Sequence, residues 1–236
     1  MNIAPFIFIG LFATFSASWF GFVFRSQAEI GRETQYMNPI TGAVYPVARE
    51  GRAQQGTEVY RAQGCAACHT QQVRALSEGN DIVRGWGIRR TVAADYMLDR
   101  PALLGNVRLG PDLANIGLRK GTNDVVALYK HLINPRSVRG GEKSIMPLYK
   151  YLFEKRRASG TPGAVIMENE PGFEYIPSDD AKSLVAYLIS LKSNGDVFEA
   201  PMPQPKAPST NAPAGTNMTA TATNAAAAPT TNAPAK

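Results

Sequence analysis

Cys65-Ala66-Ala67-Cys68-His69 is the stretch from which the rest of this chain can be interpreted. Two thiols separated by two residues, with a histidine directly after the second, form the attachment pattern of a c-type haem. A short turn holds both sulfurs where they can add to the vinyl groups of one porphyrin, and it places the His69 imidazole under the iron as proximal ligand. The sequence therefore predicts one haem c, bound covalently through Cys65 and Cys68 and ligated by His69.

Two other interpretations of the same residues fit less well. A thioredoxin-like redox pair would lie in a βαβ pattern, and no such pattern surrounds residue 65. A structural zinc site takes four ligands, usually from two Cys/His pairs. The sequence contains two cysteines and two histidines, and His131 is the one candidate outside the motif, so there is no second pair.

The composition and charge narrow the possible partners and the compartment. The 236-residue chain carries a net charge of +6, but no Lys/Arg run with interleaved aromatic residues suggests a nucleic-acid partner. A basic surface instead suits anionic lipid or an acidic redox partner. Covalent haem attachment needs reduced thiols presented outside the cytoplasm, so we expect a periplasmic domain.

An uncharged segment of 22 residues with eight aromatic side chains runs from Ile3 to Phe24. As a helix it would be about 33 Å long, enough to cross a bilayer. A cleaved signal peptide is the alternative, but no basic residue precedes Arg25 and the small residues at 16–18 lie among Phe and Trp. We expect an uncleaved anchor. The haem requirement then places residues 25 onward outside, although the positive-inside rule gives no support for this orientation.

The rest of the chain divides by composition into three parts after the anchor at 1–24. Residues 25–50 are rich in turn signals and read as a connector, residues 51–195 as the haem domain, and residues 196–236 as a disordered tail of Ala, Pro, Thr and Asn.

Two helices are predicted to frame the haem domain. The first spans residues 52–63, with Ala53, Val59, Tyr60 and Ala62 as buried positions, and Gly64 ends it. The second spans residues 178–192, with a serine N-cap, two aspartates in its first turn and an apolar face. We expect the second helix to pack against the first.

The haem iron needs a sixth ligand, for which Met or His is the usual choice. His131 stands at the end of an amphipathic pattern before a proline, and we expect a satisfied, partly buried histidine there. Met97 and Met167 fit better as core residues. Met146 follows a glycine-rich turn at 140–141 and precedes a proline, so a loop can extend it across the haem face. We therefore expect Met146 to be the distal ligand.

Two further stretches bear on the haem. Residues 109–113 read as a tight turn against the porphyrin edge. Arg89 and Arg90 follow Trp86 closely, and we expect two solvated charges. The alternative is that they neutralise a haem propionate through bidentate contacts.

Several segments share one family's pattern: 65–74 (CAACHTQQVR), 84–87 (RGWG) with 89–93 (RRTVA), 110–115 (GPDLAN), and 144–147 (SIMP) followed by Tyr149 and 152–156 (LFEKR). Together they resemble the mono-haem cytochrome c subunit, subunit II, of cbb3-type cytochrome c oxidases. The resemblance covers roughly residues 1–192, including the N-terminal span, and leaves the tail without a family role.

The resemblance implies a mainly α fold, with one transmembrane helix and a class I cytochrome c domain. It assigns the thioether bonds to Cys65 and Cys68, the proximal position to His69 and the distal position to Met146. The implied function is electron transfer towards a haem–copper catalytic subunit that reduces oxygen to water. The implied location is the bacterial inner membrane. The implied partners are that subunit, a further cytochrome c subunit and a soluble cytochrome donor.

The chain itself has too few histidines for an oxygen-reducing site, so we expect an electron-transfer subunit without catalytic residues. Two competing functions remain: a free membrane-anchored carrier, and the cytochrome subunit of a nitric oxide reductase. The matches at 84–93 and 152–156 weaken the second. A structural role without haem is a third alternative.

Overall fold

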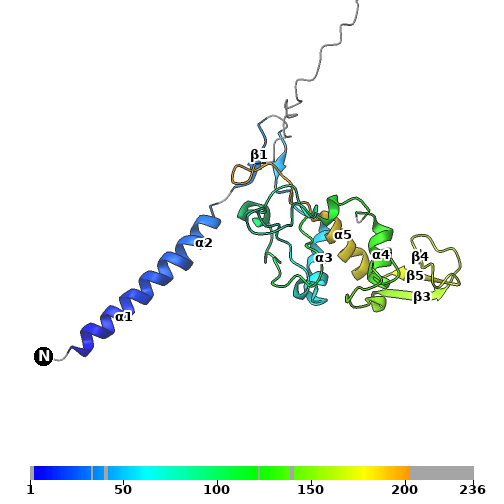
Figure 1. Ribbon diagram of the computed structural model, residues 1–236, viewed down its shortest axis with the longest axis horizontal. Coiled ribbons are helices and arrows are strands. Elements are labelled where there is room, and N and C mark those ends of the chain that lie inside the picture. The colour runs from blue at the N-terminus through cyan, green and yellow to red at the C-terminus, as the bar shows by residue number, and fades with distance from the viewer. Residues whose placement is uncertain (1–2, 33, 40–41, 122, 139–140, 202–236) are drawn as a thin grey trace, which may run out of the picture. The chain divides into compact units, whose positions relative to one another are not determined.

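The computed structural model describes residues 3–32, 34–39, 42–121, 123–138 and 141–201 (Figure 1). The chain divides into two units, residues 1–203 and 204–236. The second unit lies outside the described residues, as does Gly140 of the predicted turn. The tail predicted at 196–236 is thus described only as far as residue 201.

The N-terminal segment forms one continuous helix, composed of α1 (Ala4–Trp19), a π-helical turn (Phe20–Phe24) and α2 (Arg25–Ile30). None of its residues is buried, and among the described residues this helix alone is long and apolar enough to cross a membrane. It extends past the predicted boundary at residue 24. An ion pair between Arg25 and Glu29 one turn apart, with Nε and Oε1 at 3.0 Å, supports the added turn.

The predicted connector also contains a short antiparallel hairpin, formed by β1 (Tyr36–Met37) and β2 (Val44–Tyr45). The Asn38 N–H donates to the Ala43 carbonyl oxygen over 2.8 Å and closes the hairpin loop. The turn residues of this region therefore lie in the loop between two paired strands. Each strand has only two residues, which is too short for an alternating pattern to be recognised in the sequence.

Two helices frame the domain, as predicted. They are α3 (Gly51–Ala62) and α5 (Asp179–Ser190), and they pack against each other. The Ser178 side chain caps α5 by accepting the Ala181 N–H over 3.2 Å. Capping removes one of the unpaired donors at the start of a helix and contributes about 1 kcal/mol.

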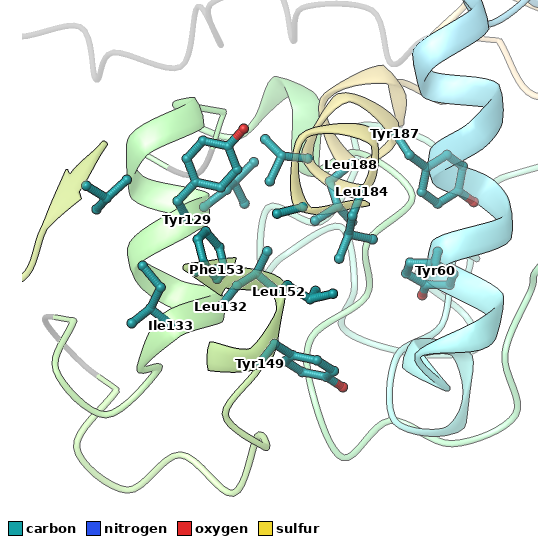
Figure 2. Packing of buried hydrophobic residues seen from close by; sticks show 14 of the residues in the cluster. Tyr60, Tyr129, Leu132, Ile133, Tyr149, Leu152, Phe153, Leu184, Tyr187 and Leu188 are labelled. Carbon is teal, nitrogen blue, oxygen red and sulfur yellow. The ribbon is translucent and has the colours of Figure 1, made fainter. Parts of the chain in front are cut away.

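The contact between α3 and α5 is close because Gly56 has no side chain. A Cβ at Gly56 would overlap the carbonyl oxygen of Ser183. One turn further along, the rings of Tyr60 and Tyr187 pack at a tilt of 59°, with centroids 5.2 Å apart (Figure 2). Of the predicted buried positions, Ala53 and Tyr60 are buried and Val59 is half-buried, whereas Ala62 is exposed and that prediction was wrong.

A third helix, α4 (Val125–Ile133), completes the core that α3 and α5 begin (Figure 2). The Asp124 carboxylate caps it by accepting the Ala127 N–H over 2.9 Å. The buried aliphatic residues include Leu128, Leu132, Ile133, Leu184, Val185 and Leu188. Burying each of them stabilises the fold by roughly 1.5–3 kcal/mol.

The mainly α prediction missed a three-stranded antiparallel sheet with the strand order β3-β5-β4. Its members are β3 (Phe153–Arg157), β4 (Val165–Ile166) and β5 (Phe173–Pro177). The domain therefore combines helices and sheets. In β3 a single buried Phe is followed by four exposed residues, so the alternation that identifies a strand is absent from its sequence.

Aspartates organise the loops between His69 and α4. The Asp112 carboxylate accepts the Thr70 hydroxyl over 2.6 Å and the Gln72 N–H over 2.7 Å. Arg108 pairs with Asp81 at 2.6 Å. These bonds fix a long segment with little regular structure, because each buried carboxylate holds the backbone or side chain of several neighbours.

The packed part of the described chain continues beyond residue 195, where the sequence predicted the tail to begin. Val197 and Ala200 are buried, at 2% and 6% exposure, and pack with Val92. Residues 196–200 therefore still belong to the folded domain, and the Ala/Pro-rich part of the sequence begins after them.

Candidate functional site

The Cys-x-x-Cys-His motif lies directly after α3. Gly64 takes a left-handed conformation (φ +69°) that ends the helix, and the chain continues as a 3-10 turn from Cys65 to Ala67. Glycine enters that conformation without steric cost. Cys65 and Cys68 are both half-buried and carry free thiols. Both sulfurs are therefore presented on one short turn.

The His69 side chain is oriented by the turn at Gly110 and Pro111. Its Nδ1 lies 2.8 Å from the Pro111 carbonyl oxygen. A carbonyl can only accept, so Nδ1 carries the proton and Nε2 keeps its lone pair for a metal. Gly110 packs so closely on the ring that a Cβ there would overlap it. Burial lowers the pKa of His69, which keeps the ring neutral as a metal ligand must be.

His69 lines a cavity of about 530 Å³. Most of its other lining residues are apolar: Leu113, Ile116, Ala127, Leu128, Leu132, Val138, Met167 and Leu188. This volume lies within the roughly 300–1,000 Å³ of small-molecule and cofactor sites, which are mostly apolar with a few placed polar groups. An oriented imidazole in a mostly apolar cavity, with two thiols on the turn just before it, fits a haem. Cys65 and Cys68 themselves are not among the described residues that line the cavity.

Met146 lines the same cavity as His69. Its loop is fixed at both sides: the Ser144 hydroxyl oxygen accepts the Met146 N–H over 3.2 Å, and the Tyr149 N–H donates to the Leu132 carbonyl on α4 over 2.9 Å. Met97, the weaker candidate, is not among the cavity-lining residues that the structure describes. Met167 lines the cavity but is 3% exposed within the core, as expected for a packing residue.

His131 also lines this cavity, which sequence reasoning did not predict. Burial lowers the pKa of its imidazole, and the nearby His69 lowers it further. The His131 ring is half-buried, as expected, and it forms no hydrogen bond to the described residues.

Arg89 is neither a solvated charge nor a cavity-lining residue. Its side chain is 2% exposed and forms two hydrogen bonds to the Asp95 carboxylate, at 2.6 and 2.9 Å. Its Nε donates to the Gly195 carbonyl oxygen over 2.7 Å. Arg90 is exposed and donates to the Glu199 carbonyl oxygen over 2.9 Å. Both arginines thus bind the C-terminal segment, and the expectation that Arg89 is a solvated charge was wrong.

Arg119 is the basic residue near His69 that the sequence interpretation missed. It lines the cavity and donates to the Asp112 carbonyl oxygen, and its positive charge contributes to the lowered pKa of His69. No local pattern marks it, because it stands directly after a short 3-10 helix (Ile116–Leu118), outside the segments that carry the family pattern.

A larger cavity of about 830 Å³ lies between the connector, α3 and α5. None of its lining residues in the described chain is a Cys, His or Met. Cavity size alone therefore does not identify the site, and the His and Met side chains line the smaller cavity.

One protein family has a model that matches most of this chain. The family described as cytochrome c oxidase, mono-heme subunit (FixO), matches residues 43–193. The chain belongs to this family. The match begins in the connector, includes the haem motif, the cavity and α5, and bears out the resemblance to the mono-haem subunit of cbb3-type oxidases. A search of curated proteins found no match.

Membership in the mono-haem subunit family implies one haem and an assembly with other oxidase subunits. The complex to which the family belongs is an oxidoreductase. The N-terminal helix is suited to anchor such a subunit in a membrane.

Proposed function

We propose that this subunit passes electrons through one covalently bound haem c towards the oxygen-reducing haem–copper subunit of a cbb3-type oxidase. The observation that carries the proposal is the cavity that brings together His69, oriented through Nδ1, and Met146. Cys65 and Cys68 would hold the haem through thioether bonds, His69 and Met146 would be its axial ligands, and the domain would have a class I cytochrome c fold. The bound haem supplies one-electron chemistry at its iron.

The protein residues around the cavity prepare the site in three ways. The Pro111 carbonyl holds the His69 ring in one tautomer and one orientation. The apolar side chains of α4 and α5 exclude water and so influence the reduction potential. A thioether from Met146 favours reduced iron, as an electron acceptor in a respiratory chain requires.

The helix at Ala4–Ile30 would anchor the subunit in the bacterial inner membrane, with the haem domain in the periplasm. The requirement for reduced thiols outside the cytoplasm supports this orientation. The partners would be the catalytic subunit, a further cytochrome c subunit and a soluble cytochrome donor. The family match does not favour the nitric oxide reductase alternative.

The test compares reduced-minus-oxidised spectra of the full-length wild type with those of Met146→His and Met97→His. We expect a low-spin c-type α band in all three and loss of the weak red Met–iron band in Met146→His alone. Loss of that band in Met97→His instead would contradict the distal assignment.

Attachment and assembly are tested separately. After denaturing electrophoresis, wild type should retain haem stain, and Cys65→Ala/Cys68→Ala should lose it. On blue-native gels the stained subunit should migrate with oxygen-consuming oxidase. A stained band that migrates alone would identify a free carrier.

A further inference from the structure

We propose that His131 is a reserve ligand for the haem iron, which takes the sixth position whenever the Met146 thioether leaves it. The inference rests on the proposed function, because it takes the covalent haem and the His69–Met146 ligation as given.

Both histidines of the sequence face a single cavity, although they come from different parts of the fold. His69 follows the attachment turn, and His131 lies in the last turn of α4. Ala127, one helical turn before His131, lines the same cavity. Residues four apart share a helix face, so this face of α4 presents the His131 imidazole towards the site.

The position of His131 is fixed by the rest of α4. Leu128, Leu132 and Ile133 are buried in the core, and Asp124 caps the first turn. The imidazole itself has no hydrogen-bond partner among the described residues. A half-buried imidazole that forms no hydrogen bond to the described residues keeps a nitrogen available to bind a metal ion.

The loop that carries Met146 is attached to the helix that carries His131. Tyr149, three residues after Met146, donates its N–H to the carbonyl of Leu132, the residue next to His131. On the other side of the loop, Gly141 packs so tightly on Pro135 that a Cβ would overlap the Pro135 carbonyl oxygen. Met146 and His131 therefore line one cavity from two segments that are connected by a backbone hydrogen bond.

The exchange of Met146 for His131 at the iron needs no added reactant. The sulfur–iron bond breaks, a bond from the neutral His131 nitrogen to iron forms, and no electron is transferred. A thioether is a soft ligand that suits reduced iron, whereas an imidazole also suits oxidised iron. The consequence is that the iron remains six-coordinate, so small ligands such as carbon monoxide find no open position.

The experiment uses the full-length, haem-loaded chain with Met146→Ala, alone and combined with His131→Ala. Electron paramagnetic resonance of the ferric protein and carbon monoxide binding to the ferrous protein are measured. We expect Met146→Ala to lose the red Met–iron band, remain low-spin and resist carbon monoxide. The double variant should become high-spin and bind carbon monoxide readily.

Lys130 provides the matched control, because its side chain also lines the cavity and an amine can bind iron. Met146→Ala/Lys130→Ala should remain low-spin. A low-spin signal that survives His131→Ala, or is lost with Lys130→Ala, overturns the proposal. So does a high-spin Met146→Ala protein. If Met146→Ala does not accumulate, Met146→Leu, which keeps the cavity filled, replaces it with the same expected results. If the red band survives the loss of Met146, the proposed distal ligand fails, and this inference fails with it.

Discussion

The α3–α5 pair and the loops between residues 70 and 115 are stabilised by different forces. In the helix pair, a glycine lets two backbones approach, and apolar faces bury each other around Tyr60 and Leu184. In the loops, carboxylates such as Asp95 and Asp112 hold a chain with little regular structure. One domain thus holds its helices together by apolar packing and its loops by buried hydrogen bonds and ion pairs. The free energy of unfolding should therefore respond differently to substitutions in the two regions.

The largest effect is expected from Asp95→Ala, which breaks the polar side. Asp95 binds Arg89 in a pair whose side chains are 2% and 0% exposed, and it accepts the Tyr45 hydroxyl over 2.5 Å. Without Asp95 the Arg89 charge is buried without its partner, so the free energy of unfolding should fall by about 3–5 kcal/mol. Urea titration of the full-length protein measures it.

The control for this substitution is Glu58→Ala, which removes an exposed ion pair with Arg61 and should change stability by less than about 1 kcal/mol. The double variant Arg89→Met/Asp95→Leu isolates the charge effect, because it removes the unpaired Arg89 charge and should recover part of the loss. The Tyr45 hydroxyl and the Val92 N–H still lose their acceptor in this variant. An Asp95→Ala protein as stable as wild type would show that the polar contacts do not hold this loop.

A smaller effect is expected from Gly56→Ala, which breaks the packed side. The added methyl group would overlap the Ser183 carbonyl oxygen, and a backbone cannot move aside as a side chain can. We expect the free energy of unfolding to fall by about 1–3 kcal/mol. Gly51→Ala, at the start of the same helix with open space around it, is the matched control and should be nearly neutral. Equal stability of the two variants would contradict close packing at Gly56.

The smallest effect concerns pH. Hydrogen bonds from Lys155, Tyr175 and Lys150 lower the pKa of Glu170 from 4.5 to about 2. Because the pKa is lower in the folded state, the stabilisation is complete above pH 4.5 and is lost as the pH falls towards 2. Glu170→Gln should therefore flatten the acid limb of stability between pH 4.5 and 2, as followed by urea midpoints. If stability fell equally steeply with pH in Glu170→Gln and in wild type, other carboxylates would cause the acid sensitivity.

The sequence predicted the parts of the fold that local rules specify. The α5 helix follows from a serine cap and a periodic apolar face, and the end of α3 follows from Gly64. The small sheet could not be predicted, because β3 is mostly charged and β4 has only two residues. Its stability comes from pairing with β5, a contact between distant segments.

The candidate site shows the same division. The turn that carries Cys65, Cys68 and His69 is local, so the Cys-x-x-Cys-His motif predicts it directly. Arg89 could not be placed, because its partners include a carbonyl at Gly195, far along the chain. The position of His131 at the cavity could not be predicted either, since it depends on which face of α4 meets the cavity. A short helix with apolar residues on several sides leaves that face open.

The contacts of Arg89 and Arg90 with Gly195 and Glu199 have a practical consequence for the expression of the chain without its N-terminal helix. The family match ends at residue 193, so a shortened protein could be designed to end there. A truncation there would remove both carbonyl acceptors and expose Val92, whereas a fragment that ends after Pro201 would keep them.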